Sequence, residues 1–509
     1  MNHCLLFGVN NYHRSAGAHR IASQLRTDGW DAEVIDFSVR WPLEKLQELA
    51  KSRINKNTKF FGFSFIFNRI PQEEVVVQFM KWIKKTYPSI ILIGGGQGLM
   101  TEKFSILDYY LVGYGEIGLK ALLSYLFSNG EKPNFDAALI LKEKKTKTIS
   151  TLHKYPAHPF PEAIIKYEPR DFYTEHEFGQ IEFSRGCKFK CSFCNFPILG
   201  VKGDYTRDPE SVYEQLMFNY DNYGIRDYTI ADETFNDYTE KLTKFADVVD
   251  RLPWKPFMSS FIRADLLVSR KKDREELLRM GVTAHYYGIE TFNEKAGKYI
   301  GKGMNPEKLK EGMIEVKNFF KSHVGNRYKG TIALIAGLPG ETLESLEQTK
   351  KWLIKNWRDQ VVAPNVLEIH KPIPGARNSK LDEEYEKLGY REIVLDEKIM
   401  LEKIKMIIHH DNFDIKVGDS EGFSWENNDM SIYDAIRWTA EIEKEVYEIG
   451  GIDLKKPAAL KLAQMYCDEK GNVLPLDDKL SLTSVYHEDA LGSNFQIFVD
   501  KYIEKKLSI

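Results

Sequence analysis

The chain has 509 residues, of which 43% are hydrophobic and 13% aromatic, and its net charge is −3 with a pI near 6.5. This length and composition predict several domains with well-filled cores. The near-zero net charge gives no global sign of a nucleic-acid partner, although a local nucleic-acid-binding patch stays open. No run reaches the roughly 18 apolar residues that a membrane helix needs, and five cysteines in so long a chain make no disulfide framework. We expect a reduced, cytoplasmic α/β protein.

Residues 1–130 alternate continuous apolar strands with amphipathic helices. This pattern is typical of a doubly wound parallel sheet, Rossmann-like in its flavodoxin-like form, with helices on both faces. Ligands bind beyond the carboxyl ends of such strands, where Gly94 and Gly95 would admit the backbone close to a flat or phosphorylated ligand. Glycines also end strands without any ligand. The expected strands are residues 4–9, 31–37, 59–67, 89–96 and 108–115.

Residues 131–172 have a different character. A charge-rich stretch at 141–151 is followed by the proline-punctuated segment 155–163. We expect an exposed hairpin and an extended linker here.

A longer alternation occupies residues 173–380 and predicts a partial (β/α)6 barrel of the TIM type. In that architecture the functional groups lie at the carboxyl ends of the strands. The residues at those ends are Cys187, Asp232, Glu233, Arg263, Glu290, Gly337 and His370. The expected strands are residues 179–186, 227–233, 256–263, 284–291, 329–339 and 365–374. Residues 381–509 are charged and mostly helical by pattern, and we assign no chemistry to them.

Three of the five cysteines, Cys187, Cys191 and Cys194, fall within eight positions. Three thiols are one short of a structural zinc site or a fully ligated iron–sulfur cluster. A zinc site would need a fourth ligand such as His158 or His176. The alternative is a [4Fe–4S] cluster with one iron left open to a substrate or cofactor, because an incomplete ligand shell makes a metal site reactive.

The segment "RGCKFKCSFC" at 185–194 resembles the CxxxCxxC loop of radical S-adenosylmethionine (SAM) enzymes, including the aromatic Phe193 before the last cysteine. Five further segments resemble barrel motifs of that family in the expected order: "IADETF", "SSFIRADLL", "YYGIET", "IALIAGLPGET" and "HKPIPGA". The resemblance implies a [4Fe–4S] cluster whose open iron binds SAM. It also implies cleavage of SAM to a 5′-deoxyadenosyl radical, which abstracts hydrogen from the substrate, and a flavodoxin- or ferredoxin-type electron donor.

The resemblance also assigns roles to single residues. The three cysteines would bind the cluster, and Phe193 would lie against the nucleoside or the cluster. Asp232 or Glu233 would accept a hydrogen bond from the SAM amino group, and Arg263 would pair with a carboxylate of SAM or of the substrate. Glu290 would contact the ribose or methionyl end of SAM, and Gly337 would border its adenine. Several of these residues have structural alternatives. Phe193 could be a core aromatic, Asp232 a helix N-cap, Arg263 a partner of Asp265 or Asp232, and His370 a satisfied core histidine rather than an acid–base group.

The N-terminal region resembles the cobalamin-binding domain that often precedes such barrels, through "AHRIASQLRTDGWDAEVIDF", "LIGGGQG" and "DYYLVGYGEIGLKALL". The DxHxxG pattern that supplies a cobalt-ligating histidine is missing, although His13 and His19 are present in another spacing. Two alternatives follow: a domain that binds cobalamin, and a domain that only covers the barrel.

The resulting prediction is a radical SAM enzyme acting on a small-molecule or otherwise unknown substrate. If cobalamin binds, methyl transfer to an unactivated carbon is the leading reaction; without it, rearrangement, oxidation and epimerisation are equally open. A tRNA methylthiotransferase is a related alternative, weakened because only Cys4 lies in the N-terminal region. A non-catalytic iron–sulfur or zinc-binding protein is the alternative from another class.

Overall fold

The computed structural model describes most of the chain, and the statements below concern the described residues. The residues outside this description are 11–13, 66–72, 97–105, 136–146, 151–163, 172, 173, 175, 195, 197–199, 201–204, 373–377, 395–421, 445–465 and 476–487. His13 and His158 therefore lie outside the described residues.

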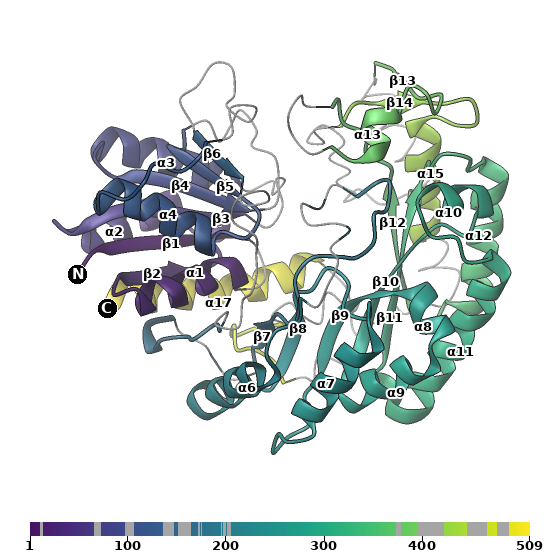
Figure 1. Ribbon diagram of the computed structural model, residues 1–509, viewed down its shortest axis with the longest axis horizontal. Helices are drawn as coiled ribbons and strands as arrows, with labels where there is room; N and C mark the ends of the chain where they lie inside the picture. Colours follow the sequence, from purple (N-terminus) through teal and green to yellow (C-terminus); the bar gives the residue numbers. More distant parts are fainter. Residues whose placement is uncertain are drawn as a thin grey trace.

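The N-terminal part contains a six-stranded, all-parallel sheet in the order β2-β1-β3-β4-β5-β6 (Figure 1). The prediction of a doubly wound parallel sheet is confirmed. A sixth strand, β6, pairs in parallel with β5 from within the segment that we expected to be hairpin and linker. The strands are β1 (His3–Val9), β2 (Asp31–Ile35), β3 (Thr58–Phe65), β4 (Ile91–Gly96), β5 (Tyr109–Val112) and β6 (Lys147–Ser150).

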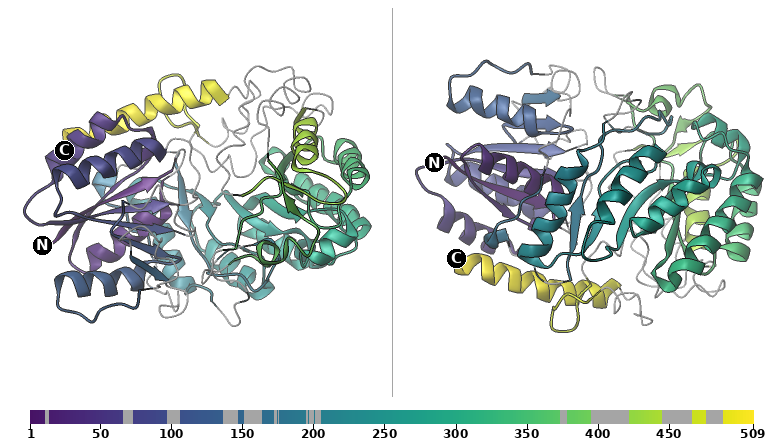
Figure 2. Two further views of the ribbon diagram at one scale, coloured as in Figure 1. Left: turned by 90° about the horizontal axis from the view of Figure 1, so that it is seen from above. Right: turned by 60° about the horizontal axis from the view of Figure 1, so that its bottom comes forward.

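Each face of this sheet has its own apolar core. One core joins the sheet to α1 (Ala16–Thr27) and α4 (Glu116–Phe127). The other joins it to α2 (Leu43–Arg53), α3 (Glu73–Thr86) and the C-terminal helix α17 (Glu488–Ser508). Figure 2 shows α17 (yellow) lying along the N-terminal sheet, although the helix stands at the other end of the sequence. A helix that we assigned to a separate C-terminal region is therefore part of the N-terminal core.

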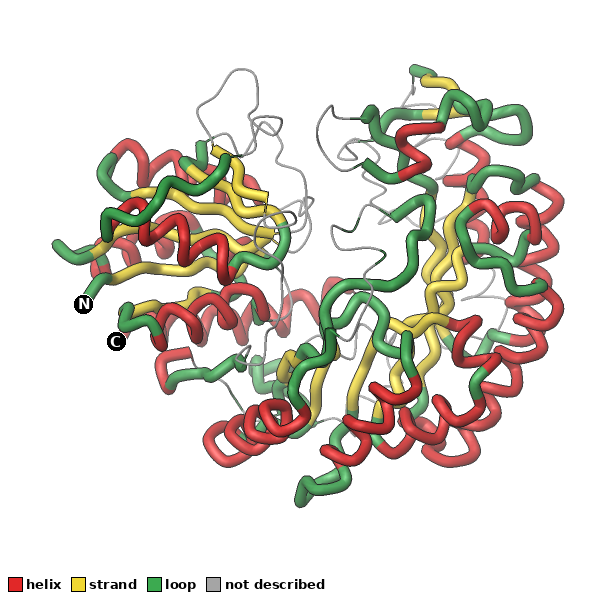
Figure 3. The backbone as a smooth tube through the Cα atoms, viewed as in Figure 1, coloured by secondary structure: helices red, strands yellow, loops and turns green. Residues whose placement is uncertain are grey.

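The second sheet also has six parallel strands, in the sequential order β7 to β12, with no pairing between its first and last strands. This open, curved sheet with helices on its outer side is the expected partial barrel (Figure 3). Its strands are β7 (Phe178–Ile181), β8 (Asp227–Ile230), β9 (Met258–Arg263), β10 (Val282–Glu290), β11 (Lys329–Ala336) and β12 (Val361–Val366). The helices are α6 (Pro209–Tyr223), α7 (Thr239–Val249), α8 (Ala264–Ser269), α9 (Lys271–Arg279), α10 (Glu294–Tyr299), α11 (Pro306–Val324) and α12 (Leu343–Asn356).

Local sequence signals begin many of these helices. Asp208 and Asn305 cap α6 and α11, and each is followed by a proline at the first helical position. Thr342 and Ser345 form a reciprocal capping box at the start of α12. Side-chain oxygens at these positions satisfy amide donors that have no partner within the helix. Single 3₁₀ turns lie at Ser38–Arg40, Pro169–Asp171 and Gly325–Arg327.

The last barrel strand begins earlier than predicted, at Val361 rather than at residue 365. The predicted strand covered residues 365–374, immediately after Pro364, and a proline removes one donor from a strand ladder. In the structure β12 is the edge strand, paired only with β11, so Pro364 can lie within it. His370 consequently lies beyond the strand.

The described parts of residues 381–509 are divided between the two sheets. A short helix α13 (Lys380–Glu384), the strand pair β13 (Arg391–Glu392) and β14 (Trp425–Glu426), and helix α15 (Ile432–Lys444) pack at the barrel. Helix α17 packs on the first sheet. Within the described residues, no helix combines the length and apolarity that crossing a bilayer requires.

Candidate functional site

The loop with the three cysteines follows β7 at the carboxyl end of the barrel. Gly186, with φ +79°, turns the chain into it, a left-handed conformation that favours glycine. Within the loop the Cys194 amide donates to the Cys191 carbonyl at 3.1 Å, and the Gly200 amide donates to the Cys187 carbonyl at 2.6 Å. The loop is also fixed from outside, because the Leu381 amide donates to the Ser192 carbonyl at 2.8 Å.

The three thiols are reduced and partly shielded. Cys187 is buried, and Cys191 and Cys194 are half-buried. Burial raises the pKa of Cys187 and raises that of Cys194 to about 11. Among the described residues, no three His, Cys, Asp or Glu side chains are arranged around a single metal ion. A cubane cluster makes a different demand, since each thiolate binds a separate iron, and three soft ligands in one half-buried loop fit that donor set.

Arg263, at the end of β9, contacts the cysteine loop directly. Its Nη1 lies 3.6 Å from Cys191 Sγ, and its guanidinium stacks 3.7 Å from the Phe189 ring centroid. Asp265 accepts from its Nε at 2.8 Å, so the predicted pairing with Asp265 is present. Phe189 had no role in the sequence analysis, and its position inside the CxxxCxxC loop is the only signal that could have found it.

Asp232 and Glu233 follow β8 and differ in their surroundings. Asp232 is buried, and its carboxylate accepts from the Phe183 amide at 2.8 Å and the Ser184 hydroxyl at 2.5 Å, which fixes the end of β7. Glu233 is half-buried and accepts from the Gly186 amide at 3.1 Å. Burial raises the pKa of Asp232 to about 6 and that of Glu233 to about 8. Of the two, Glu233 is the carboxylate directed to the cysteine loop.

Glu290 ends β10 with φ +68°, a strained conformation for a residue with a side chain. Its carboxylate accepts from Lys302 Nζ at 2.9 Å. Strain of this kind is kept only where the surrounding structure imposes it, and it clusters at binding sites. The predicted site residue is thus held in an unusual conformation beside the cysteine loop.

The glycine turn after β11 is built against the C-terminal region. Gly337 has φ +102°, and a methyl group there would lie 2.3 Å from the Trp425 ring. Tyr390 donates its hydroxyl to the Gly337 carbonyl at 2.6 Å. Buried Glu341 accepts from the Gly337 and Leu338 amides and from Thr291 Oγ1, and burial raises its pKa to about 7. Trp425, not a ligand, occupies this face of Gly337, and the sequence analysis missed Trp425, Tyr390 and Glu341.

Two further predicted residues have mainly structural contacts. Phe193 is half-buried and packs against the barrel core. His370 is half-buried, and its amide donates to Asp382 Oδ1 at 2.8 Å. The roles predicted for both residues stay predictions.

The N-terminal domain reaches the cysteine loop through a closed ring of ion pairs. Arg185, two residues before Cys187, pairs with Glu116 at 2.5 Å and Glu182 at 2.7 Å. Arg20 of α1 pairs with the same two carboxylates. The hydroxyl of Tyr114 donates to Glu233 at 2.9 Å, and the Arg185 guanidinium lies 4.1 Å from the Tyr114 ring centroid. The start of the cysteine loop is therefore held by residues from both sheets.

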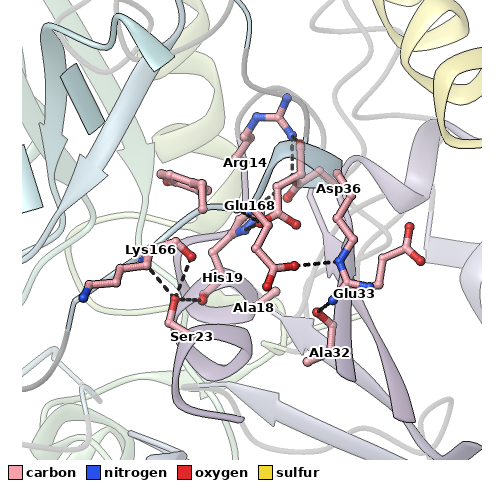
Figure 4. A network of polar contacts seen from close by, with 12 residues as sticks. Arg14, Ala18, His19, Ser23, Ala32, Glu33, Asp36, Lys166 and Glu168 are labelled. Atoms are coloured by element: carbon pink, nitrogen blue, oxygen red, sulfur yellow. Dashed lines mark hydrogen bonds and ion pairs between the residues drawn. The ribbon is translucent and has the colours of Figure 1, made fainter. Parts of the chain in front are cut away.

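A second buried network lies at the carboxyl end of β1 (Figure 4). Arg14 donates to Asp36 at 2.9 Å and to Glu177 at 2.8 Å. His19 Nε2 lies 2.8 Å from Asp36, whose amide donates to the Tyr502 hydroxyl at 3.2 Å. Burial opposes ionisation of Asp36, but His19 and Arg14 hold its pKa well below the usual range.

The same edge allows a test of the predicted cobalamin site. A methyl group on Gly94 would clash with Leu107 and Tyr110, whereas one on Gly95 would meet only the Leu111 carbonyl at 3.8 Å. Gly94 thus serves internal packing and Gly95 offers an open approach. His19 is committed to Asp36. Because His19 is 1% exposed between Asp36 and Asp171, no histidine in the described part of this edge faces an open site for cobalt, and room beside Gly95 is the one feature there that suits a corrinoid.

The segment that carries this site is similar to known proteins. Residues 181–353 match the family described as the Radical SAM superfamily. The uncharacterized methyltransferase PH0819 of Pyrococcus horikoshii is 26% identical over 302 residues, covering 56% of this chain and 61% of that protein. The hopanoid C-3 methylase of Methylococcus capsulatus is 24% identical over 305 residues, covering 58% and 57%. The chain thus spans about three fifths of the length of these relatives.

A solved structure agrees over more of the chain. The cobalamin-dependent SAM radical enzyme OxsB, with aqua-cobalamin and SAM bound, aligns with a TM-score of 0.54 at 17% identity, covering 88% of this chain and 62% of that one. At this identity the similarity shows the fold. The chain is thus similar to the radical SAM superfamily over residues 181–353, and its fold resembles that of a cobalamin-dependent SAM radical enzyme.

Proposed function

We propose that this protein cleaves SAM reductively and uses the resulting 5′-deoxyadenosyl radical to abstract hydrogen from a substrate. The observation that carries the proposal is the half-buried three-cysteine loop at the carboxyl end of β7, with Arg263 from β9 in contact with Cys191. A [4Fe–4S] cluster held by three thiolates supplies an open iron for SAM and the electron for its cleavage. A flavodoxin- or ferredoxin-type protein would deliver that electron.

The chain's own residues then have distinct tasks. Cys187, Cys191 and Cys194 hold the cluster. Arg263 places a cation beside the Cys191 sulfur, where it offsets the negative charge of the thiolate ligands. Glu233 and Glu290 are the two carboxylates directed to the site, and either would accept hydrogen bonds from the SAM ammonium or ribose. Asp232 and Glu341 position the strand ends that carry these groups.

We also propose methyl transfer as the reaction that follows hydrogen abstraction. Two relatives are named methyltransferase and methylase, and the fold resembles a cobalamin-dependent enzyme. Cobalamin would supply the methyl group from the N-terminal domain, beside the open Gly95. Methylthio transfer is less favoured, although some relatives are methylthiotransferases. The only cysteines outside the loop are Cys4 and Cys467, so no second three-cysteine cluster can form.

Anaerobically reconstituted protein tests both proposals. With SAM, a strong reductant and cobalamin, the wild type should release 5′-deoxyadenosine, and Cys191→Ala should not. Cys467→Ala is the matched control, because it removes a buried thiol outside the loop and should leave release unchanged. A bound corrinoid spectrum together with S-adenosylhomocysteine formation would support methyl transfer. Copurifying zinc with no iron or sulfide would contradict the radical SAM proposal.

A further inference from the structure

Phe261, in the middle of β9, is unusually exposed for a strand residue. Its side chain is 38% exposed, whereas its neighbours Ser260 and Ile262 are 1% and 2% exposed. Because successive side chains of a strand point to opposite faces, Phe261 lies on a face of β9 that the described residues leave partly open at this position. The opposite face of this strand packs into the barrel core through Ile262.

Phe261 lies on the same side of the sheet as the cysteine loop. Side chains two residues apart on a strand share a face, so Phe261 and Arg263 point to the same side. Arg263 touches Cys191 Sγ. Phe261 is therefore one side-chain row away from the cysteine loop, about 7 Å along the strand. A molecule lying on its ring would be within reach of the site where SAM is cleaved.

The neighbouring strands extend this surface. Tyr286 is paired with Phe261 in the ladder, and the two rings meet at 5.2 Å in a T-shaped arrangement. Asn365 on β12 lies near the Tyr286 hydroxyl, and its Nδ2 donates to the Leu334 carbonyl at 3.2 Å and to the Ala363 carbonyl at 3.1 Å. The next row carries the small side chains of Ala333 and Ala363, which are aligned with each other. We call Phe261, Tyr286 and Asn365 the aromatic shelf.

The charges next to the aromatic shelf are already paired. Arg263 is bound to Asp265, and Glu290 is bound to Lys302. The shelf itself offers two rings and neutral hydrogen-bonding groups. A charged substrate placed on it would lose its hydration without gaining a counter-ion, which is costly, whereas an apolar ring would gain contact area at no such cost.

We infer that the aromatic shelf binds the substrate, and that the substrate is a neutral, largely apolar ring skeleton with a hydroxyl or carbonyl directed to Tyr286 and Asn365. This inference rests on the proposed function, since it assigns the substrate class of that site. It also places the reacting carbon on the face of the skeleton that is turned to the cysteine loop.

Two probes that differ in charge test the inference: 2-naphthalenemethanol and 2-naphthoate. Their dissociation constants are measured by ligand-observed NMR on anaerobic protein reconstituted with cluster and SAM. The neutral alcohol should bind at least fivefold more tightly than the carboxylate. Phe261→Ala should weaken its binding at least fivefold, and Tyr286→Phe about threefold. The matched control is Ile497→Ala, because Ile497 is 37% exposed on α17, which packs on the other sheet, and should not affect binding.

Equal or tighter binding of 2-naphthoate would overturn the neutral class, and wild-type affinity in Phe261→Ala would overturn the shelf as the binding surface. Release of 5′-deoxyadenosine by the same preparations separates this failure from that of the proposed function. If 5′-deoxyadenosine is released but Phe261→Ala binds the probes as the wild type does, the assignment of the aromatic shelf is wrong and the proposed function stands. If no preparation forms 5′-deoxyadenosine, the proposed function falls, and the assignment of the shelf to a substrate falls with it.

Discussion

The two sheets of this protein have six parallel strands each, yet they use their surfaces in opposite ways. The N-terminal sheet is covered on both faces, by α1 and α4 on one side and by α2, α3 and α17 on the other. Among the described residues the helices of the barrel cover the outer side of its sheet, and the inner face carries half-exposed Phe261 and the cysteine loop. The same strand–helix alternation therefore produces a closed layer in one case and an open reactive face in the other.

The carboxyl ends of the strands show the same difference. In the N-terminal sheet the polar side chains at the end of β1 neutralise one another, with Arg14, His19 and Asp36 all buried. At the barrel, Cys191, Cys194, Glu233 and Glu290 are half-buried. Buried charges must be paired, so the closed layer uses its polar groups for its own stability, whereas half-buried groups stay partly accessible to a ligand.

The largest expected effect comes from breaking the closed layer. Arg14→Met removes the cation between Asp36 and Glu177 and leaves two buried carboxylates without it, which should cost about 3–5 kcal/mol. Urea unfolding measures the loss. The control is Arg437→Met, an exposed arginine of α15, which should change stability by less than about 0.5 kcal/mol. An equal loss of unfolding free energy in both variants would show that the buried ion pairs of Arg14 stabilise the fold no more than an exposed arginine does.

A second substitution tests how the C-terminal region supports the open face. Gly337→Ala combines an unfavourable φ with a clash against Trp425, so we expect a loss of about 3 kcal/mol. Gly303→Ala is the matched control, since a methyl group there meets nothing within 4 Å. The measurement is the free energy of unfolding of both variants. Wild-type stability in Gly337→Ala would mean that Trp425 does not pack tightly on this turn.

A third test concerns the ion-pair ring between the two sheets. Burial opposes ionisation of Glu116, but Arg185 and Arg20 lower its pKa to about 2. A depressed folded-state pKa stabilises the fold above pH 4.5, and that contribution is lost as the pH falls toward 2. Glu116→Gln should therefore lose about 2 kcal/mol at pH 7, and its deficit should shrink on acidification below pH 4.5. A deficit that stays constant from pH 7 to pH 3 would argue against this ion pair.

The smallest expected effect is the most informative about the link to the cysteine loop. Tyr114→Phe removes one hydroxyl bonded to Glu233, which should cost about 1 kcal/mol. Because Glu233 also binds the Gly186 amide, the electron paramagnetic resonance signal of the reduced cluster should change. Tyr223→Phe removes a comparable hydrogen bond, to the Tyr167 carbonyl at 2.7 Å, and should leave that signal unaltered. An identical spectrum in Tyr114→Phe would show that the domain contact does not reach the cluster.

Prediction from sequence succeeded where the signal was local. The three cysteines lie within eight positions, and the strand–helix periodicity repeats along the chain, so the cysteine loop and the order of the elements are both visible in the sequence. The prediction of β12 was wrong at its start because an edge strand tolerates Pro364, and edge position is a property of the whole sheet. The strand β6 was missed because a short strand at the edge of a sheet is defined by its main-chain pairing, here with β5, and not by an apolar pattern in the sequence.

What the sequence by itself determined is the order of the elements, the parallel class of both sheets and the spacing of the three thiols. Only the tertiary structure decided which polar groups are paired and which remain open. Tyr502 meets Asp36 across 466 positions, and Tyr114 meets Glu233 across 119. Contacts of this kind depend on how two sheets and a returning helix pack, and no periodicity along the chain encodes them.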